Sequence, residues 1–163
     1  MRIRRAEPAD AAEIWAVHTR AVRQGCRSHY SPADLAAWTS RANPAAYVDA
    51  IATRRVYVAE ADNGRIAGFA QLHPQEGAIE AVYVDPDFAR QGVGRAMLYA
   101  LEDDARALGL PGLLVEASLN SVPFYGALGF GHECWSHHSL GGGHRIACAV
   151  MTKRLAKPPP GMG

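Results

Sequence analysis

Residues 82–95, VYVDPDFARQGVGR, decide the fold of this chain of 163 residues. The first three form a β-branched and aromatic run that is typical of a strand, and Gly92 and Gly94 open a helical stretch. A helix N-terminus leaves about four amide donors without partners and carries about half a positive charge. Because Arg90 and Arg95 add charge at the same place, the segment predicts a site for a phosphorylated ligand.

Two better-known phosphate-binding motifs are absent from this segment. No lysine follows the glycines, so GxxxxGK[ST] does not occur, and GxGxxG would need a glycine where Met97 stands. Glycines two residues apart are weak evidence alone, since a helix can begin in this way without binding a ligand. A nucleotide-binding protein that uses this helix start therefore stays an alternative.

Strand and helix patterns continue on both sides of the segment. Strand-like runs occur over 1–5, 56–60, 66–73, 78–84, 113–117, 132–138 and 145–153. Helical spacing or start signals occur over 8–25, from 31, from 43, over 92–108 and over 122–128. The buried stripe of the long helix is predicted to be Met97, Leu98, Leu101, Ala105 and Leu108.

These elements predict a single α/β domain over residues 1–155. The turn Asp62-Asn63-Gly64 joins two strands of an antiparallel meander, which a strand–helix–strand unit and a final hairpin follow. Residues 156–163 are rich in proline, and we expect them to be a disordered tail.

Composition and charge limit the classes of function. A hydrophobic fraction of 48% and a charged fraction of 20% are ordinary for a globular protein, and a net charge of +1 gives no electrostatic footprint for nucleic acid. No run approaches the roughly 18 apolar residues of a membrane helix, and the first thirty residues contain no signal-peptide core. Since the three widely spaced cysteines suit a reducing compartment, we expect a cytoplasmic protein without nucleic-acid or membrane partners.

The histidines and cysteines near the C-terminus do not predict a metal site. Adjacent residues of a strand point to opposite faces, so His137 and His138 cannot both face one ion. No standard zinc spacing links them to His132, Cys134 or His144. No cysteine stands beside a recognisable triad signature, so a cysteine nucleophile is not expected either.

A second segment, residues 118–130, reads SLNSVPFYGALGF. It resembles an asparagine followed by FYxxxGF, a signature of the GNAT superfamily of acyl-CoA-dependent N-acetyltransferases. Residues 89–94 are similar to that family's pyrophosphate motif, Q/R-x-x-G-x-G/A, and the two motifs stand one strand apart, as in the family. Ala89 occupies the Q/R position, but the family uses this loop mainly through main-chain amides, and Arg90 is a candidate to replace the side chain.

The resemblance extends from Ile3 to Leu155 and includes the closing Met151-Thr152-Lys153. The stretch from Arg20 to Trp38 is similar to that of a bacterial GNAT subgroup of uncertain substrate. The family's fold is a mixed, largely antiparallel central sheet flanked by helices, with a strand–helix–strand cofactor unit. Its activity is the transfer of an acetyl group from acetyl-CoA, as cosubstrate and without a metal, to a primary amine by direct attack through a tetrahedral intermediate.

The resemblance also implies roles for individual residues. The strand backbone would pair with the pantetheine arm of the coenzyme as an extra strand would, at Val82, Tyr83 and Val84. Main-chain amides would bind the pyrophosphate at Arg90, Gln91, Gly92, Val93, Gly94 and Arg95. Asn120 would hold the pantetheine through its side chain, and Tyr125 would lie by the coenzyme sulfur. Asn120 could also be a helix cap, a role compatible with coenzyme binding.

Acetyl transfer needs groups that move protons. An amine with a pKa of about 10 must lose a proton before it attacks, and Glu80 is the candidate base, directly or through water, because strand alternation puts it on the face of Val82 and Val84. The Val82 amide is the candidate donor to the oxyanion, and the Tyr125 hydroxyl could protonate the leaving thiolate. A solvent-facing Glu80 and a Tyr125 that only packs stay open as alternatives.

The acceptor is not identified by the sequence. His29, Tyr30 and Trp38 precede or lie on the early helices, which in the family wall the acceptor site, although the helical stripe of Leu35 and Trp38 favours packing for the tryptophan. We expect a small-molecule or peptide amine, and family habit suggests a monomer or homodimer. A non-catalytic acyl-CoA-binding sensor is the alternative to an enzyme.

Overall fold

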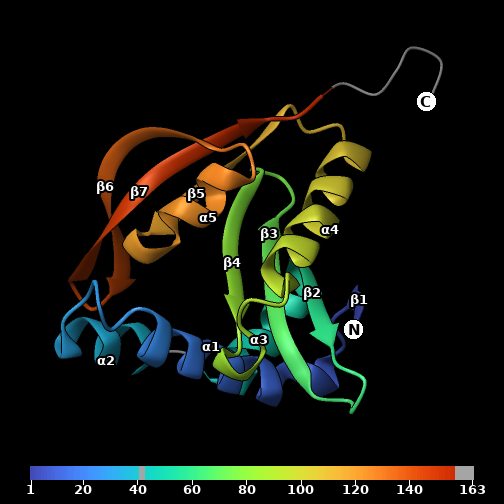
Figure 1. The fold of residues 1–163 in the computed structure, drawn as a ribbon, viewed down its shortest axis with the longest axis horizontal. Helices are drawn as coiled ribbons and strands as arrows, with labels where there is room; N and C mark the ends of the chain where they lie inside the picture. The colour runs from blue at the N-terminus through green and yellow to red at the C-terminus, as the bar shows by residue number, and fades with distance from the viewer. Residues whose placement is uncertain (41–42, 157–163) are drawn as a thin grey trace.

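The computed structural model describes residues 1–40 and 43–156, so nearly all of the predicted tail lies outside the described residues. Within them, one seven-stranded sheet has the order β1-β2-β3-β4-β5-β7-β6 (Figure 1). The strands are β1 (Arg2–Arg5), β2 (Arg55–Glu60), β3 (Ile66–His73), β4 (Ala78–Val84), β5 (Gly112–Ser118), β6 (Gly131–Gly141) and β7 (His144–Arg154). Every neighbouring pair is antiparallel except β4 and β5, which confirms the predicted meander, the strand–helix–strand unit and the mixed, largely antiparallel sheet.

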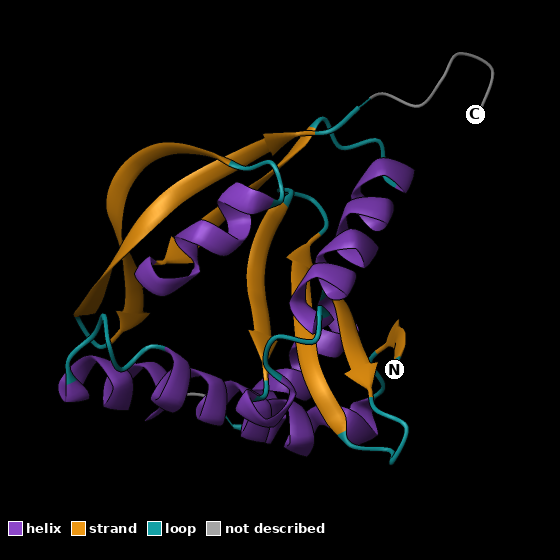
Figure 2. Cartoon of the chain, viewed as in Figure 1, coloured by secondary structure: helices purple, strands orange, loops and turns teal. Residues whose placement is uncertain are grey.

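Helices cover both faces of the sheet. They are α1 (Ala11–Gly25), α2 (Pro32–Ser40), α3 (Pro44–Thr53), α4 (Val93–Ala107) and α5 (Val122–Ala127), with 3-10 turns η1 (Pro8–Asp10), η2 (Pro86–Phe88) and η3 (Leu119–Ser121). Helices α1 to α3 run across the lower part of the view in Figure 2, while α4 and α5 lie over the strands. One buried cluster joins α1 and α3 to β2 and β3, and another joins α4 and α5 to the opposite face.

Helix α4 packs with the stripe that its sequence predicts. Met97, Leu98, Leu101 and Ala105 are fully buried in the cluster on its side of the sheet. Leu108 was wrongly predicted to belong to this stripe: the helix ends at Ala107, and the Leu108 side chain is 42% exposed.

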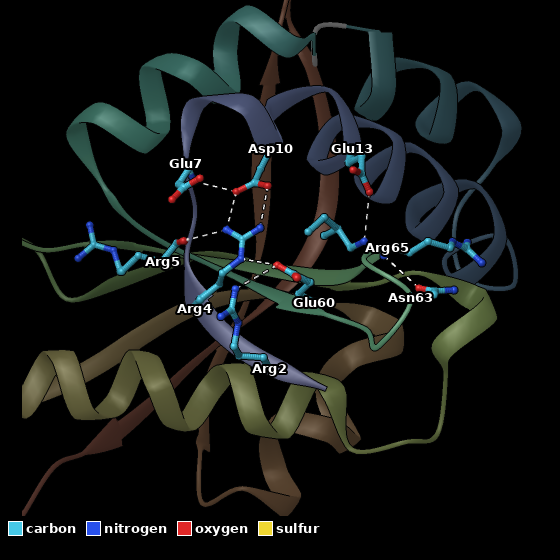
Figure 3. A network of polar contacts seen from close by, with 10 residues as sticks. Arg2, Arg4, Arg5, Glu7, Asp10, Glu13, Glu60, Asn63 and Arg65 are labelled. Atoms are coloured by element: carbon cyan, nitrogen blue, oxygen red, sulfur yellow. Dashed lines mark hydrogen bonds and ion pairs between the residues drawn. The ribbon is translucent and has the colours of Figure 1, made fainter.

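A polar network fixes the start of α1 against the sheet (Figure 3). The Arg4 guanidinium donates to Glu60 at 2.6 Å and to both carboxylate oxygens of Asp10 at 2.8 and 3.0 Å. This hydrogen bonding holds the pKa of the Asp10 carboxyl below its usual range. The Glu13 carboxylate accepts the Ile66 N–H at 3.1 Å, so α1 is tied to β1, β2 and β3.

Strand β4 contains a bulge that the sequence did not reveal. Gln71 pairs with Ala81 while Leu72 pairs with Ile79, so Glu80 is the extra residue and the two-residue alternation is interrupted. The prediction that Glu80 shares a face with Val82 was therefore wrong. Val82 packs with the α4 cluster, whereas the Glu80 carboxylate accepts hydrogen bonds from Arg54 at 2.7 Å and Gln71 at 3.2 Å, on the side of α3.

Strands β4 and β5 pair only where they begin. The parallel ladder joins Ala78 to Leu114 and Ile79 to Val115, and no further pair connects the two strands in the described residues. Figure 1 shows them spreading apart below the top of the view. The sheet is thus opened in its middle.

Gly68 lets α4 lie close to β3. A Cβ at this position would be 2.8 Å from Met97 Cε and 2.8 Å from the Tyr83 carbonyl oxygen. We expect Gly68→Ala to lower the free energy of unfolding by about 1–3 kcal/mol, because the backbone oxygen cannot move aside freely. Urea unfolding measures this, with Gly126→Ala in α5 as the control, where a Cβ meets nothing within 4 Å. Equal stability of the two variants would contradict the packing described here.

Candidate active site

A cleft of about 530 Å³ lies where β4 and β5 part. Both strands line it, β4 with Glu80, Val82 and Val84 and β5 with Glu116. Helix α2 and the η3–α5 segment contribute further walls. The cleft is therefore lined from both sides of the sheet, by α5 on one side and by α1 and α2 on the other.

The loop that enters α4 presents a row of free amides. Arg90 and Gly92 both have left-handed backbones, with φ of 63° and 76°. The Ala96 N–H donates to the Gly92 carbonyl at 3.1 Å, and none of the N–H groups of residues 90–95 has an acceptor among the described residues. Alternating backbone conformations that leave successive amides free form a concave site for an anion. A diphosphate fits this donor set, as the sequence predicts.

Gly94 sets the spacing between this helix start and its neighbours. A Cβ there would lie 3.3 Å from the Phe124 ring on α5 and 3.5 Å from Val84 on β4. Glycine therefore brings the α4 N-terminus against both motifs, and residues 82–95 and 118–130 meet at one end of the cleft.

An ion-pair cluster that the sequence analysis missed holds the loop in place. Asp85 is 3% exposed, receives the Asp87 N–H at 2.9 Å and lies 3.1 Å from the Arg20 guanidinium on α1. Asp87 accepts from Arg20 at 3.0 Å and from Arg65 at 3.1 Å, and these contacts hold the pKa of its carboxyl below the usual range. The loop is thus anchored to two elements that precede it in the chain.

Asn120 carries an unpaired acceptor at the cleft. Its Oδ1 atom is buried and has no hydrogen-bond partner among the described residues, which is costly unless a ligand donates to it. The residue lies within η3 and lines the cleft, and no capping bond by its side chain occurs there. The N–H of a pantetheine amide is a donor of the required kind.

Tyr125 lines the same cleft from α5. Its ring packs edge-on against Phe124 and Phe130, with centroids 5.0 and 5.3 Å away. Burial raises the pKa of its hydroxyl, so the group stays protonated at neutral pH. It makes no hydrogen bond to another described residue, and a ligand in the cleft can receive its proton.

The three predicted acceptor residues do not line one common cavity. Trp38 lines the cleft and also packs edge-on against Tyr30, with ring centroids 5.2 Å apart. The Tyr30 hydroxyl donates to the Ala147 carbonyl and accepts the Leu119 N–H, and the ring is buried, so this side chain joins β7 to η3. His29 is exposed and lines a separate apolar groove beside Trp135.

The sequence analysis did not anticipate a polar group in the cleft around Glu116. Glu116 Oε2 lies 3.1 Å from His138 Nδ1 and 3.8 Å from the Cys148 thiol, and all three residues line the cleft. The alternation of β5 places Glu116 opposite the buried Val115 and Ala117, and that pattern was the available signal. Among the described residues, His, Cys, Asp and Glu form no group of three or more that could hold a metal ion. None of the helices described has the length and apolar character of a membrane span.

Comparison with known proteins agrees with this geometry. Residues 26–137 match the profile of the acetyltransferase (GNAT) domain. The uncharacterized N-acetyltransferase YafP of Escherichia coli K12 is 31% identical over 130 residues, which cover 80% of this chain and 81% of that protein. A GCN5-related N-acetyltransferase structure from Rhodopseudomonas palustris, described as an aminotransferase of class II, has a TM-score of 0.88 at 30% identity and covers 94% of this chain and 95% of its own. The PaiA N-acetyltransferase of Thermoplasma acidophilum, solved with coenzyme A, has the same fold, with a TM-score of 0.79 at 18% identity over 94% of this chain and 98% of its own.

Fold and cleft thus define an enzyme that transfers acyl groups. The chain belongs to the GNAT family and is a GNAT-type N-acetyltransferase. The family resemblance read from the two sequence motifs is confirmed.

The role of the Asp85 ion pairs in holding the loop can be tested. We expect Asp85→Ala to lower the free energy of unfolding by about 1–3 kcal/mol, because a buried acceptor of a charged hydrogen bond is lost, and to speed amide exchange across residues 86–92. Hydrogen exchange with mass spectrometry measures the second effect. Asp62→Ala is the control, since Asp62 is fully exposed in its pair with the N-terminus. Unchanged exchange in the Asp85 variant would show that the ion pairs do not hold the loop.

Proposed function

We propose that this protein moves an acetyl group from acetyl-CoA to a primary amine by direct attack, through a tetrahedral intermediate and without an acyl-enzyme. The observation that carries the proposal is the closeness of three features: Asn120 with its unpaired Oδ1 and Tyr125 both line the cleft, and the helix start with the free amides of residues 90–95 packs through Gly94 against Val84 of the cleft wall. These groups match a diphosphate, an amide and a thiol in the order in which coenzyme A presents them. The coenzyme A bound to the Thermoplasma relative supports the same ligand here.

The residues that hold the donor substrate are assigned by their free polar groups. The amides of Arg90 to Arg95 bind the pyrophosphate, and Asn120 accepts from a pantetheine amide. The backbone of Val82 to Val84 is not paired with β5, so the pantetheine arm lies along it as an additional strand would. Arg90 stands next to Ala89 and supplies the side-chain charge that alanine lacks.

The chemical step moves two protons. The amine nitrogen bonds to the thioester carbonyl carbon, the Val82 N–H donates to the oxyanion, and the carbon–sulfur bond breaks as the amide forms. Tyr125 gives its proton to the departing thiolate, the conjugate base of a thiol whose pKa in water is about 8.5. The proton of the amine passes through water to Glu80. Arg54 and Gln71 hold the Glu80 carboxylate on the side of the sheet that α1 to α3 cover, which is the acceptor side of the cleft.

Removing the hydroxyl of Tyr125 tests its role as the acid. We expect Tyr125→Phe to lower turnover by about 10²–10⁴-fold, with the dissociation constant of acetyl-CoA unchanged, because the ring still fills its place. Steady-state release of coenzyme A and calorimetric titration measure the two quantities. Tyr57→Phe, which removes a hydroxyl bonded to Asp104 away from the cleft, is the control. Full turnover in the Tyr125 variant would remove this residue as the proton donor.

The two ends of α4 provide a matched test of the pyrophosphate site. Gly92 and Gly109 have φ of 76° and 74°, and a Cβ at either meets nothing within 4 Å. Gly92→Glu puts a carboxylate where the diphosphate belongs, so we expect calorimetry to detect no acetyl-CoA binding. Gly109→Glu carries the same backbone strain and should bind as the wild type does. A Gly92 variant that binds normally would refute the assignment, and binding without release of coenzyme A with any amine would favour the sensor.

A further inference from the structure

The lining of the cleft carries three carboxylates, and among the described residues His138 is the one basic side chain in it. Glu76, Glu80 and Glu116 line the cleft, and no lysine or arginine is among the described residues that do so. The bulge turns Glu80 toward Gln71 and α3, and Glu116 lies on the face of β5 that it shares with Cys148 of β7. Two of the three carboxylates thus enter the cleft on its acceptor side from opposite strands.

These two carboxylates differ in how their charge is balanced. Glu80 is paired with the permanent cation of Arg54 at 2.7 Å. Glu116 has an ion-pair contact only with His138 among the described residues, and a neutral imidazole leaves the carboxylate charge in place. The side chain of Glu116 is 43% exposed, so a ligand in the cleft can reach it.

Aromatic residues line the same cleft as these carboxylates. They are Trp38 of α2 and Tyr83 of β4. An ammonium group is attracted both by carboxylates and by the faces of aromatic rings. A second carboxylate on the ligand would be repelled by Glu116 and would find no guanidinium or ammonium among the described residues of the wall.

The acceptor end of the cleft is narrowed by a helix. Cys26, Tyr30 and Ile146 form a buried cluster into which Leu35 and Trp38 of α2 pack. His144 Nε2 at the β6–β7 turn lies 2.8 Å from the Asp34 carboxylate on α2. Figure 1 shows α2 lying across the lower ends of β6 and β7. A compact acceptor suits this enclosure better than a folded protein surface.

We infer that the acceptor is a small cationic amine, aliphatic or arylalkyl, with no carboxylate next to the reacting nitrogen, and that Glu116 selects for it. This inference rests on the proposed function, since it names the substrate class of the same site. Glu116 is assigned a specificity role here: it contacts the cation of the acceptor and disfavours the carboxylate of an amino acid.

Pairs of compounds that differ only in a carboxylate test the inference. Tyramine is compared with tyrosine and isoamylamine with leucine, by release of coenzyme A from acetyl-CoA and by calorimetric binding to the protein loaded with coenzyme A. We expect kcat/KM to be at least about tenfold higher for each amine than for its amino acid. The kcat/KM of tyrosinamide should be close to that of tyramine, because tyrosinamide has the size of tyrosine but lacks its carboxylate. Equal or better use of the amino acids would overturn the inference while leaving the acetyltransferase intact.

The two readouts separate the inference from the proposed function. If the amines bind in preference to the amino acids but release no coenzyme A, the cationic acceptor site stands and the catalytic proposal fails. A higher kcat/KM for trialanine amide than for each of the small amines would overturn the small-molecule assignment. The absence of binding by any amine would overturn the site itself.

Charge variants test the residue. We expect Glu116→Gln to lower kcat/KM for tyramine about tenfold and to narrow the tyramine-to-tyrosine ratio, and Glu116→Lys to shift that ratio further toward tyrosine. Glu133→Gln on β6 is the control, since the Glu133 carboxylate accepts a hydrogen bond from the Thr152 hydroxyl and the residue does not line the cleft. If Glu116 had only a structural role, its variants would lower kcat/KM equally for tyramine and tyrosine. An unchanged tyramine-to-tyrosine ratio in the two Glu116 variants would therefore overturn the assignment.

Discussion

In the part of the chain that the structure describes, strands β4 and β5 pair through two residue pairs, and beyond Ile79 and Val115 they no longer pair with each other. Backbone donors and acceptors in the middle of a sheet are normally paired, so an opening here needs a compensating ligand or water. The opening lets groups from both faces of the sheet reach one space. Asn120, Tyr125 and the carboxylates of Glu80 and Glu116 line it, and the α4 helix start with its free amides packs beside it against Val84.

The rest of the fold keeps this opening in shape. Gly68 lets α4 lie close to β3, and Gly94 lets the first turn of α4 pack against Phe124 and Val84, so the helix N-terminus has a fixed place beside β4. Asp85 and its arginine partners tie the intervening loop to α1 and to the turn between β2 and β3. The Tyr30 hydroxyl joins β7 to η3 on the far wall. Both halves of the sheet are thereby held apart by contacts outside the gap.

Features that depend on neighbours in sequence were predictable, and those that depend on distant partners were not. The strand–loop–helix of residues 82–95, the segment 118–130, the meander and the α4 stripe follow local period and glycine placement. The bulge at Glu80 was invisible because it is defined by the register with Gln71 and Leu72 on another strand. The Asp85 cluster joins residues 20, 65, 85 and 87, and no spacing in the sequence indicated it. The alternation of β5 could indicate which way Glu116 faces, but not that His138 and Cys148 of two other strands lie beside it.

The central claim is that the parted strands and the α4 loop together receive a coenzyme A thioester, and amide hydrogen exchange resolved by residue tests it most directly. Addition of acetyl-CoA should slow exchange at Val82 to Val84 and at Arg90 to Arg95, while the amides of β1 and β2, on the far edge of the sheet, exchange as before. Binding that left both stretches unprotected, or that protected another part of the molecule instead, would contradict the account.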